Sequence, residues 1–328
     1  MIYSAIVSCF DDKGRPNPEA VFAAVEHNIV HSGVDGLFVN GSTGENPDMM
    51  NDQRKPMLKL MMDAAAGRVA MIAHIGTNVL EEFDELAKCS ADLGYDAVAS
   101  VAPTYFPYDQ EDYVRFFLTL ADRSPLPLYV YNIPIRTHVH LTRDSFKRIF
   151  DHPNVKGAKF TDADLDLFTS VRRDSPQADL LCGFDNLMVP FTALGANGAI
   201  GTSYNLTGKI ARRVFDLTRA GKLEEARQEQ FILNDILEAM GGVRMIQLVK
   251  ATMELYGVPC GNSRFPQPPT TDADREQAKK IYELVETISE SFMNQKTEPG
   301  SRIPAPFAVS TRFCAGLPVR EPRPVLRK

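Results

Sequence analysis

Short apolar runs alternate with amphipathic stretches along most of this chain. The apolar runs begin 18 to 34 residues apart and are almost continuously hydrophobic, as in LFV, AMIA, AVASV and LYVY. This composition is typical of parallel strands whose two faces are both buried under helices. The runs predict eight strands, at residues 3–8, 36–40, 70–75, 97–101, 127–132, 155–159, 180–184 and 198–202.

Stretches with the helical period separate these strands. In the first half of the chain they span residues 18–31, 52–66, 80–93 and 111–121. Eight strand–helix repeats without a sharp break in composition favour one closed (βα)8 barrel, the TIM barrel, and we expect it to occupy residues 1–206. An open doubly wound sheet is the alternative, but no G-x-G-x-x-G follows the first strand, which disfavours a dinucleotide-binding fold.

The chain after the eighth strand changes character twice. Four helical stretches first predict a C-terminal helical extension over residues 207–295, packed on the barrel, and they lie at residues 209–220, 223–240, 242–256 and 271–294. Residues 296–328 then carry six prolines and a net charge of +5, from seven basic and two acidic residues. Proline density without periodicity predicts a disordered tail. A contact of this tail with an acidic partner or another subunit is the alternative.

Composition and charge narrow the functional classes. The 328 residues are 44% hydrophobic and 24% charged, as in soluble globular proteins, and the formal net charge of −6 disfavours a nucleic-acid-binding surface. No apolar stretch approaches the ~20 residues that a membrane span needs. The N-terminal segment has no basic region of the kind that begins a signal peptide. We therefore expect a cytoplasmic protein that binds neither membrane nor nucleic acid.

The cysteines and histidines predict neither a disulfide framework nor a metal site. The five cysteines are an odd number, and no two of them stand at C-x-x-C spacing. His138 and His140 form one local pair that an extended segment would point the same way, but no nearby cysteine or acidic residue completes a ligand set. We expect no metal in the functional site.

A glycine-rich segment with the sequence GSTGE, at residues 41–45, directly follows the second predicted strand. Its glycines allow a sharp turn and a close approach of the backbone to a ligand. Consecutive backbone amides, with the hydroxyls of Ser42 and Thr43, can bind a carboxylate or a phosphate. The alternative is an ordinary turn in which a hydroxyl caps the next helix.

Two further strands end in side chains that can take part in catalysis. Tyr131 ends the fifth strand within YNIP, and Lys159 ends the sixth within AKFT. Barrel enzymes place their active sites at the carboxyl ends of the strands. Burial disfavours a charged lysine and so frees its amine to attack a carbonyl carbon, while a phenol can transfer protons. The alternatives are a core tyrosine and a lysine that reaches solvent from the strand tip.

These three motifs occur together with a fourth, GAIGTSYN, in the eighth strand at residues 198–205. In this combination residues 3–294 resemble the N-acetylneuraminate lyase and dihydrodipicolinate synthase superfamily. The resemblance implies a class I aldolase that handles pyruvate through a lysine Schiff base and uses no cofactor. It also implies a small-molecule 2-oxo acid substrate and a homotetramer.

The resemblance further implies roles for individual residues of this chain. Lys159 would form the imine with the 2-oxo group of the substrate, and Tyr131 would transfer protons. Ser42, Thr43 and the loop amides would bind the carboxylate of pyruvate. Ser42 would also link Tyr131 to a second tyrosine, Tyr105, which the family presents across a tight dimer interface.

Within the superfamily, several segments resemble the sialic acid lyase branch. They are VDGLFV, GSTGEN, AHIG and GYDAV, and the histidine of AHIG, His74, is expected to be a packed strand residue. We therefore expect cleavage of N-acetylneuraminate to N-acetylmannosamine and pyruvate. The resemblance implies further substrate contacts near the last three strands, from Thr161, Gly183, Asp185, Ile200 and Thr202.

Two residues depart from the lyase pattern. Asn186 follows Asp185 where the lyases carry an acidic residue, so hydrogen bonds to a sugar lose the strength of a charged acceptor. Arg136 stands where the lyases have an apolar residue and the synthases have an arginine that binds a substrate carboxylate. A surface or interface position for Arg136 is the alternative.

These departures leave other functions open. They are dihydrodipicolinate synthesis from pyruvate and aspartate semialdehyde, and cleavage or dehydration of another 2-keto-3-deoxy acid. A non-catalytic ligand-binding barrel is disfavoured, because both Lys159 and Tyr131 are present.

Overall fold

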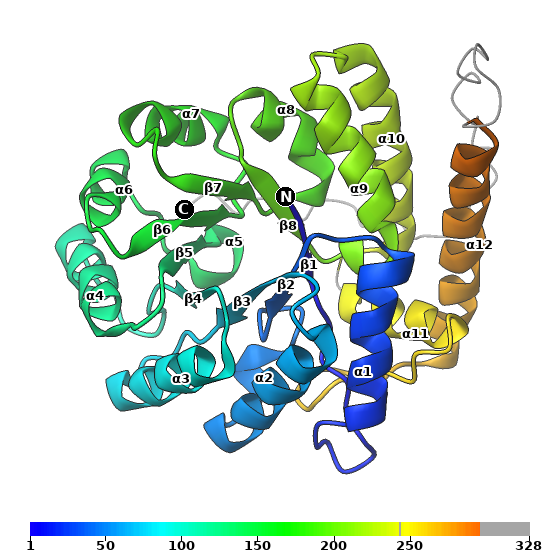
Figure 1. Ribbon diagram of the computed structural model, residues 1–328, viewed down its shortest axis with the longest axis horizontal. Coiled ribbons are helices and arrows are strands. Elements are labelled where there is room, and N and C mark those ends of the chain that lie inside the picture. The colour runs from blue at the N-terminus through cyan, green and yellow to red at the C-terminus, as the bar shows by residue number, and fades with distance from the viewer. Residues whose placement is uncertain (243, 296–328) are drawn as a thin grey trace, which may run out of the picture. The chain divides into compact units, whose positions relative to one another are not determined.

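Eight parallel strands close into a barrel in which each strand pairs with its neighbours in the chain and β1 pairs with β8 (Figure 1). The structure is a computed structural model that describes residues 1–242 and 244–295, so the predicted tail at residues 296–328 lies outside the described residues. The strands are β1 (Ile2–Ala5), β2 (Gly36–Val39), β3 (Ala70–His74), β4 (Ala97–Val101), β5 (Leu128–Asn132), β6 (Val155–Phe160), β7 (Asp179–Cys182) and β8 (Gly198–Gly201).

All eight predicted strands are confirmed, and their ends differ from the predictions by at most three residues. The largest difference is at β1, which ends at Ala5 although the apolar run continues to Ser8. Beyond the strand, the backbone amide of Val7 bonds to the side chain of Asn205, at 3.4 Å, instead of to a neighbouring strand. A buried loop and a buried strand have the same apolar composition, so the pattern cannot separate them.

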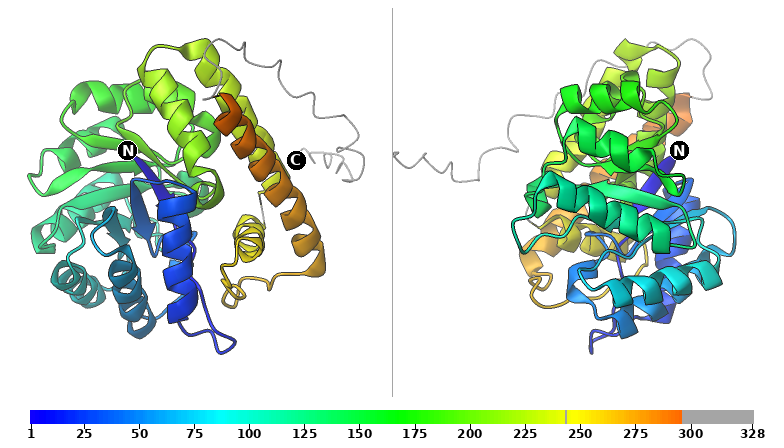
Figure 2. Two further views of the ribbon diagram at one scale, coloured as in Figure 1. Left: turned by 45° about the vertical axis from the view of Figure 1, so that its right-hand side comes forward. Right: turned by 90° about the vertical axis from the view of Figure 1, so that its left-hand side faces the viewer.

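Helices lie outside the strands and connect them (Figures 1 and 2). The segment predicted as one helix over residues 18–31 is α1 followed by a π-helix, η1 (His27–His31). Asn17 caps α1 by accepting a hydrogen bond from the amide of Ala20, and Pro18 occupies the first turn. The connecting helices are α1 (Pro18–Glu26), α2 (Asn51–Ala65), α3 (Leu80–Leu93), α4 (Gln110–Arg123), α5 (Pro134–Thr137), α6 (Arg143–Phe150), α7 (Leu165–Asp174) and α8 (Met188–Ala193).

The four predicted C-terminal helical stretches are also present. They are α9 (Tyr204–Arg219), α10 (Leu223–Met240), α11 (Met245–Leu255) and α12 (Asp272–Gln295). The side-chain amide of Gln277 in α12 donates to the backbone carbonyl of Ala239 in α10, at 2.8 Å, and Arg275 pairs with Glu254 in α11. The barrel and its helices up to Ile288 form one compact unit, and the division between barrel and extension at residue 206 stays a prediction.

The barrel interior is a packed core, and its register sets where the polar side chains emerge. Tyr131 on β5 pairs with Lys159 on β6, and Lys159 pairs with Leu181 on β7. Side chains at the carboxyl ends of these strands therefore lie at the same level. Below them the interior is filled mainly by Tyr3, Ala5, Phe38, Ile72, Ala97, Ala99, Tyr129, Leu181 and Ile200.

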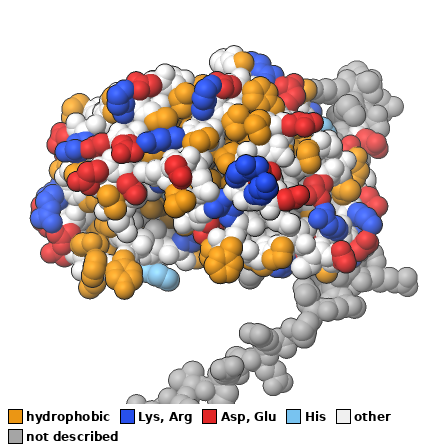
Figure 3. All heavy atoms as spheres, turned by 90° about the horizontal axis from the view of Figure 1, so that it is seen from below, with side chains coloured by type: hydrophobic (Ala, Val, Ile, Leu, Met, Phe, Trp, Pro, Cys, Tyr) orange, Lys and Arg blue, Asp and Glu red, His pale blue; other side chains and the backbone are white. Residues whose placement is uncertain are grey.

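The surface carries both signs of charge. The face in Figure 3 shows acidic and basic side chains side by side. Exposed pairs include Arg148 with Glu111 at 2.8 Å and Lys55 with Glu85 at 2.6 Å, and such pairs contribute only about 0–1 kcal/mol each. These surface pairs therefore contribute little to the stability of the fold. None of the helices in the described part of the chain is long and apolar enough to cross a membrane.

Candidate active site

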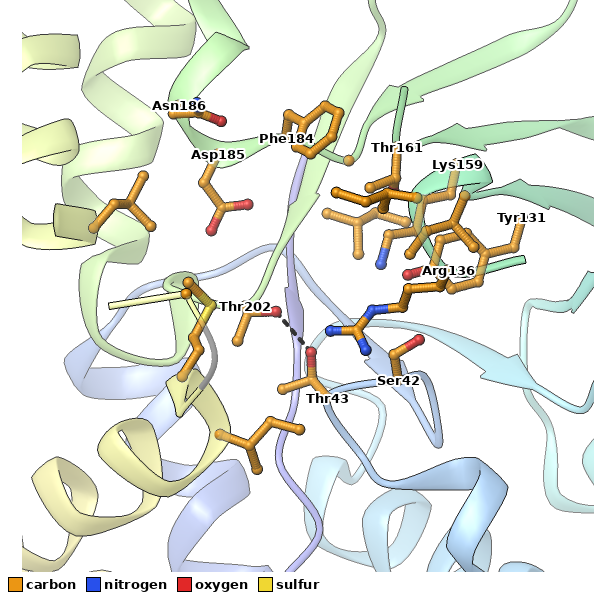
Figure 4. A pocket seen from close by; sticks show the side chains of 18 of the residues that line it. Ser42, Thr43, Tyr131, Arg136, Lys159, Thr161, Phe184, Asp185, Asn186 and Thr202 are labelled. Atoms are coloured by element: carbon orange, nitrogen blue, oxygen red, sulfur yellow. Dashed lines mark hydrogen bonds between the residues drawn. The ribbon is translucent and has the colours of Figure 1, made fainter. Parts of the chain in front are cut away.

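A cavity of about 610 Å³ opens at the carboxyl ends of the strands (Figure 4). It gathers residues from the ends of β5 to β8 and from the loop after β2. Eleven of the twelve candidate residues line it: Ser42, Thr43, Tyr131, Arg136, Lys159, Thr161, Gly183, Asp185, Asn186, Ile200 and Thr202. Residues from four strand ends and a distant loop thus share one chamber, although they are spread over 161 positions (42 to 202) of the sequence.

Lys159 is buried, with 5% of its surface exposed, and its amine points into the cavity in Figure 4. The amine nitrogen lies 4.5 Å from the ring centre of Phe38 and 4.3 Å from that of Tyr131. Within the described residues no carboxylate forms an ion pair with it. Lys159 is therefore a cavity-facing amine among aromatic rings and not a solvent-exposed strand tip.

Tyr131 lies beside Lys159 in the sheet and is 4% exposed. Its ring packs edge-on against Phe38, with ring centres 5.6 Å apart, and against His74, with ring centres 5.7 Å apart. The position next to an amine, on the cavity wall, is one from which a phenol can exchange protons with a bound ligand. The packing of two rings around it fixes its orientation.

His74 is a packed side chain, as predicted, with 2% of its surface exposed. Its Nδ1 lies 3.1 Å from the carbonyl oxygen of Asn40, and because a carbonyl only accepts, Nδ1 carries the proton. Burial, assisted by the charges of Arg54 and Lys159, lowers the pKa of His74 to about 3. The imidazole is therefore uncharged at neutral pH.

The loop of residues 41–45 is anchored from two sides. Thr43 Oγ1 and Thr202 Oγ1 are 2.7 Å apart, which ties the loop to the end of β8. Glu45 has a left-handed backbone, with φ of 59°, and its carboxylate lies 2.5 Å from the amine of Lys250 in α11, both side chains being fully buried. The backbone amide of Arg264 donates to the second carboxylate oxygen at 2.6 Å. These contacts hold Ser42 and Thr43 at the cavity wall.

The opposite wall depends on two glycines. A Cβ atom on Gly183 would lie 1.8 Å from Thr161 Oγ1, and one on Gly201 would lie 2.5 Å from Asp185 Oδ1. Ser203 donates to Asp185 Oδ2 through its amide, at 2.9 Å, and through its hydroxyl, at 2.6 Å. Burial raises the pKa of Asp185, while these hydrogen bonds and Lys159 oppose the rise. The wall thus presents a positioned carboxylate and a buried threonine hydroxyl.

Arg136 and Asn186, the two residues that depart from the lyase pattern, both line the cavity. Both side chains are exposed, and the guanidinium of Arg136 points toward the cavity on the side of Ser42 and Thr43 in Figure 4. Arg136 belongs to α5, the short helix after β5, which begins at the proline of YNIP. The cavity therefore contains a fixed positive charge that can bind an anionic group.

Sequence reasoning missed the residues that close the cavity from the C-terminal helices. These residues belong to no recognisable motif. The amphipathic pattern of a helix shows which of its faces is buried, but it does not show which cavity the helix covers. One of them, Glu238, adds an exposed carboxylate. The lining residues that were not predicted are Ile133, Ile135, Phe184, Asn234, Leu237, Glu238, Gly242, Met245 and Ile246.

Tyr105 is the one candidate that does not line the cavity. Its side chain is 83% exposed, and its ring packs edge-on against Phe106, with ring centres 5.0 Å apart. Its role across a subunit interface stays a prediction. In the described residues no group of three or more His, Cys, Asp or Glu side chains is arranged to bind a metal ion.

Comparisons with known proteins agree on one family. A model of the dihydrodipicolinate synthetase family matches residues 1–286 of this chain. The N-acetylneuraminate lyase of Clostridium perfringens is 36% identical over 280 residues, which cover 85% of this chain and 97% of the relative.

Solved structures show the same fold. The structure of N-acetylneuraminate lyase from Fusobacterium nucleatum complexed with pyruvate has a TM-score of 0.81 at 32% identity, covering 86% of this chain and 95% of that one. A catalytic lysine mutant of the sialic acid aldolase from Ruminococcus gnavus has a TM-score of 0.84 at 28% identity, covering 89% of this chain and 97% of that one. The predicted TIM barrel with a helical extension is thereby confirmed.

Proposed function

This chain belongs to the dihydrodipicolinate synthetase family, and we propose that it is a Schiff-base aldolase that cleaves N-acetylneuraminate into N-acetylmannosamine and pyruvate. The buried, cavity-facing amine of Lys159 carries the proposal, because it lies beside Tyr131 and opposite the loop of residues 41–45. Relatives named N-acetylneuraminate lyase favour cleavage over condensation with aspartate semialdehyde.

The first chemical step is formation of the imine. Ser42, Thr43 and the loop amides bind the carboxylate of the 2-oxo acid, which brings its C2 carbonyl to the amine of Lys159. The amine adds to C2, the C2 oxygen leaves as water after taking a proton from the Tyr131 phenol, and the resulting imine nitrogen carries a positive charge. This charge makes the imine an electron sink for the bond that breaks next.

The second step breaks the C3–C4 bond. Tyr131, as the phenolate, takes the proton of the C4 hydroxyl while C4 becomes the aldehyde carbon of the leaving sugar. The electron pair of the broken bond moves to the imine nitrogen and leaves a neutral enamine. Protonation at C3 and hydrolysis then release pyruvate and restore the amine of Lys159.

The wall opposite the loop supplies the contacts to the sugar. Thr161 Oγ1 is buried without a hydrogen-bond partner in the described part of the chain, so a substrate hydroxyl can satisfy it. Ser203 occupies one oxygen of Asp185, which leaves Oδ1 for the substrate. Ile200 and Thr202 line the cavity between this wall and the loop, Thr202 being bonded to Thr43, and Asn186 offers an uncharged amide.

The position of Arg136 supports a second candidate substrate class. Its guanidinium points into the cavity, where it can bind a second anionic group in addition to the pyruvate carboxylate. An aldehyde or sugar acid with its own carboxylate would satisfy it. We include such substrates in the test below.

We further propose a cytoplasmic homotetramer. Tyr105 and Phe106 expose 83% and 62% of their surfaces next to each other, which a subunit interface would bury. In that arrangement Tyr105 of one subunit reaches Ser42 of the next and completes the relay from Tyr131. Sedimentation measurements on the full chain test the oligomer.

Reductive trapping tests the mechanism. The protein is incubated with pyruvate and borohydride, and its mass is measured by mass spectrometry. Digestion then locates the adduct, which we expect on Lys159. Lys156 lies on the same strand but is exposed at its other end, so it provides a matched control. Lys156→Arg is expected to trap pyruvate as the original chain does, and Lys159→Arg to trap none. An adduct elsewhere, or none at all, would exclude the proposed imine.

A substrate panel tests the specificity. N-acetylneuraminate, aspartate semialdehyde and 2-keto-3-deoxy sugar acids are compared by kcat/KM for pyruvate release or consumption. We expect the highest value for N-acetylneuraminate. A higher value for aspartate semialdehyde would assign the chain to synthesis, and a higher value for a dicarboxylic sugar acid would assign Arg136 to the second carboxylate.

A further inference from the structure

The amine nitrogen of Lys159 lies over two aromatic ring faces, at a position where a carboxylate would be the usual partner of a buried amine. The Lys159 nitrogen lies 4.5 Å from the ring centre of Phe38 and 4.3 Å from that of Tyr131. The carboxylate of Asp185, which also lines the cavity, has one oxygen bonded to both the amide and the hydroxyl of Ser203. The positive charge of an imine at this position has aromatic rings as its direct neighbours.

We propose that Phe38 is a further catalytic residue, whose ring face, together with that of Tyr131, stabilises the positive charge of the protonated imine on Lys159. This inference rests on the proposed function, since it needs the imine to form. Phe38 touches the reacting nitrogen from β2, whereas Tyr131 contacts it from β5. No motif assigns Phe38, which belongs to the buried barrel core and is not among the residues that line the cavity.

The positive charge on the Lys159 nitrogen forms with the imine and is lost when the C3–C4 bond breaks. A neutral group can stabilise this transient charge without a permanent opposite charge. Condensation of the amine with the carbonyl group takes up a proton, releases water and leaves one positive charge on nitrogen. Breaking the C3–C4 bond sends an electron pair to that nitrogen and removes the charge. An aromatic face attracts a cation through its quadrupole and does not bear a full opposite charge. It therefore favours the iminium without binding the neutral enamine that must follow.

The surroundings hold the Phe38 ring in position. Its side chain is 1% exposed, and its ring centre lies 5.6 Å from that of Tyr131 and 6.0 Å from that of His74. A Cβ atom on Gly41 would lie 2.6 Å from the ring edge, so glycine at this position leaves the space that the ring occupies. Burial keeps the pKa of His74 at about 3, and the third ring of the group is therefore uncharged and does not repel the iminium.

Fluorinated phenylalanines at position 38 test the inference, because fluorine withdraws charge from the ring face with little change of shape. Variants with one, two and five fluorines are prepared by amber suppression, and the imine formation constant is measured as the fraction trapped by borohydride at increasing pyruvate concentrations. We expect this constant to fall with each fluorine, by about tenfold for five, in line with a desolvated cation–π contact. The kcat/KM for N-acetylneuraminate should fall in parallel.

Phe160 provides the matched control. It neighbours Lys159 on β6 and is fully buried, but it packs against Phe146, Phe168 and Phe191, away from the amine. The same fluorinated residues at position 160 are expected to leave the imine constant unchanged. Thermal unfolding of each variant verifies that it is folded, and the one- and two-fluorine variants decide the question if the five-fluorine variant does not fold.

The outcomes separate this inference from the proposed function. If the original chain forms no adduct on Lys159, the proposed Schiff-base function is wrong, and the role of Phe38 at the imine is excluded with it. If the adduct forms but fluorination at position 38 leaves the imine constant unchanged, Phe38 acts only by filling space and the inference is overturned. The same conclusion follows if Phe38→Leu weakens trapping while the fluorinated variants do not, because leucine removes both volume and ring face.

Discussion

Asn186 is one of the two side chains by which this site departs from the lyase pattern. Asn186 lines the cavity directly after the buried Asp185, in the 3-10 helix η3 (Asp185–Leu187). A carboxylate at this position would accept hydrogen bonds from sugar hydroxyls with roughly twice the strength of an amide oxygen. The asparagine therefore weakens one contact of the sugar subsite and leaves the pyruvate subsite, formed by Ser42 and Thr43, unchanged.

We expect Asn186→Glu to increase kcat/KM for N-acetylneuraminate by about tenfold, the effect of one charge-assisted hydrogen bond of about 1.4 kcal/mol. Steady-state pyruvate release measures the gain. Asn186→Gln is the control, since it lengthens the side chain without charge, and the imine constant with pyruvate alone should not change. Equal or poorer cleavage by Asn186→Glu would mean that the natural substrate has no hydroxyl at this position.

The predictable part of the site consists of residues next to strand ends. Lys159, Tyr131 and the loop of residues 41–45 were found because the order of strands places their motifs at one face of a barrel. Phe38 was not found, because a phenylalanine in an apolar strand has the same pattern whether its ring faces a core or a reactive nitrogen. Glu238 was not found either, since its distance from the barrel face depends on how α10 packs.

Among the elements, α11 lines the cavity with Met245 and Ile246 and also supports the loop of residues 41–45. Its Lys250 forms a fully buried ion pair with Glu45, and the amine also lies 4.9 Å from the ring centre of Phe10. Removing one partner of a buried pair leaves an uncompensated charge, which costs about 3–5 kcal/mol. Helix α11 therefore fixes the loop of residues 41–45 through a contact that depends on both partners.

We expect Lys250→Met to lower the free energy of unfolding by about 3 kcal/mol, because the Glu45 carboxylate stays buried without its partner. Urea unfolding measures this change, and the KM for N-acetylneuraminate should rise because Ser42 and Thr43 lose their fixed position. The double variant Glu45→Gln/Lys250→Met should recover part of the stability. Lys279→Met, which removes an exposed pair with Glu276, is the control and should change stability by less than about 0.5 kcal/mol.

A result for Lys250→Met that matched the surface control would show that the buried pair is not required for the loop.

Long-range contacts such as this pair explain why the helices and strands, and the contacts between them, are only partly predictable from the sequence. The apolar period located α11 to within three residues, yet nothing in a local pattern pairs Lys250 with a residue 205 positions away (250 − 45). The π-helix η1 was likewise hidden in a stretch predicted as one α-helix.

For the whole molecule, the eight strand–helix repeats predicted the barrel, and the closed β1–β8 pairing confirms it. The assembly is different, because contacts between copies leave no period in one sequence. The exposed rings of Tyr105 and Phe106 are one feature of the described residues that points to such contacts. The net charge of −6 is also a property of the whole chain. The pH dependence of the free energy of unfolding, in contrast, follows from a few buried titratable groups.

One of these groups is His27, which is 7% exposed and whose ring Nε2 lies 2.9 Å from the carbonyl oxygen of Asn205. Burial, followed by the neighbouring His31, lowers the pKa of His27 from 6.5 to about 4. Between these two values the unfolded chain binds a proton that the folded chain does not. The stability contributed by uncharged His27 is therefore fully present above pH 6.5 and is lost as the pH falls through about 4.

We expect His27→Gln to flatten the pH dependence of stability between about pH 6 and about pH 5 by roughly 1.4 kcal/mol per pH unit, the linkage of one proton. Glutamine keeps a donor for the carbonyl of Asn205 but does not titrate. Urea unfolding at both pH values gives the slope, and His140→Gln is the control, because His140 is exposed. Burial raises the pKa values of Glu45 and Asp185, which act with the opposite sign, but both groups are common to all three proteins and cancel from the difference. If the free energy of unfolding changed equally with pH in His27→Gln and His140→Gln, His27 would titrate alike in the folded and unfolded chains. Its burial would then not destabilise the folded protein at acidic pH.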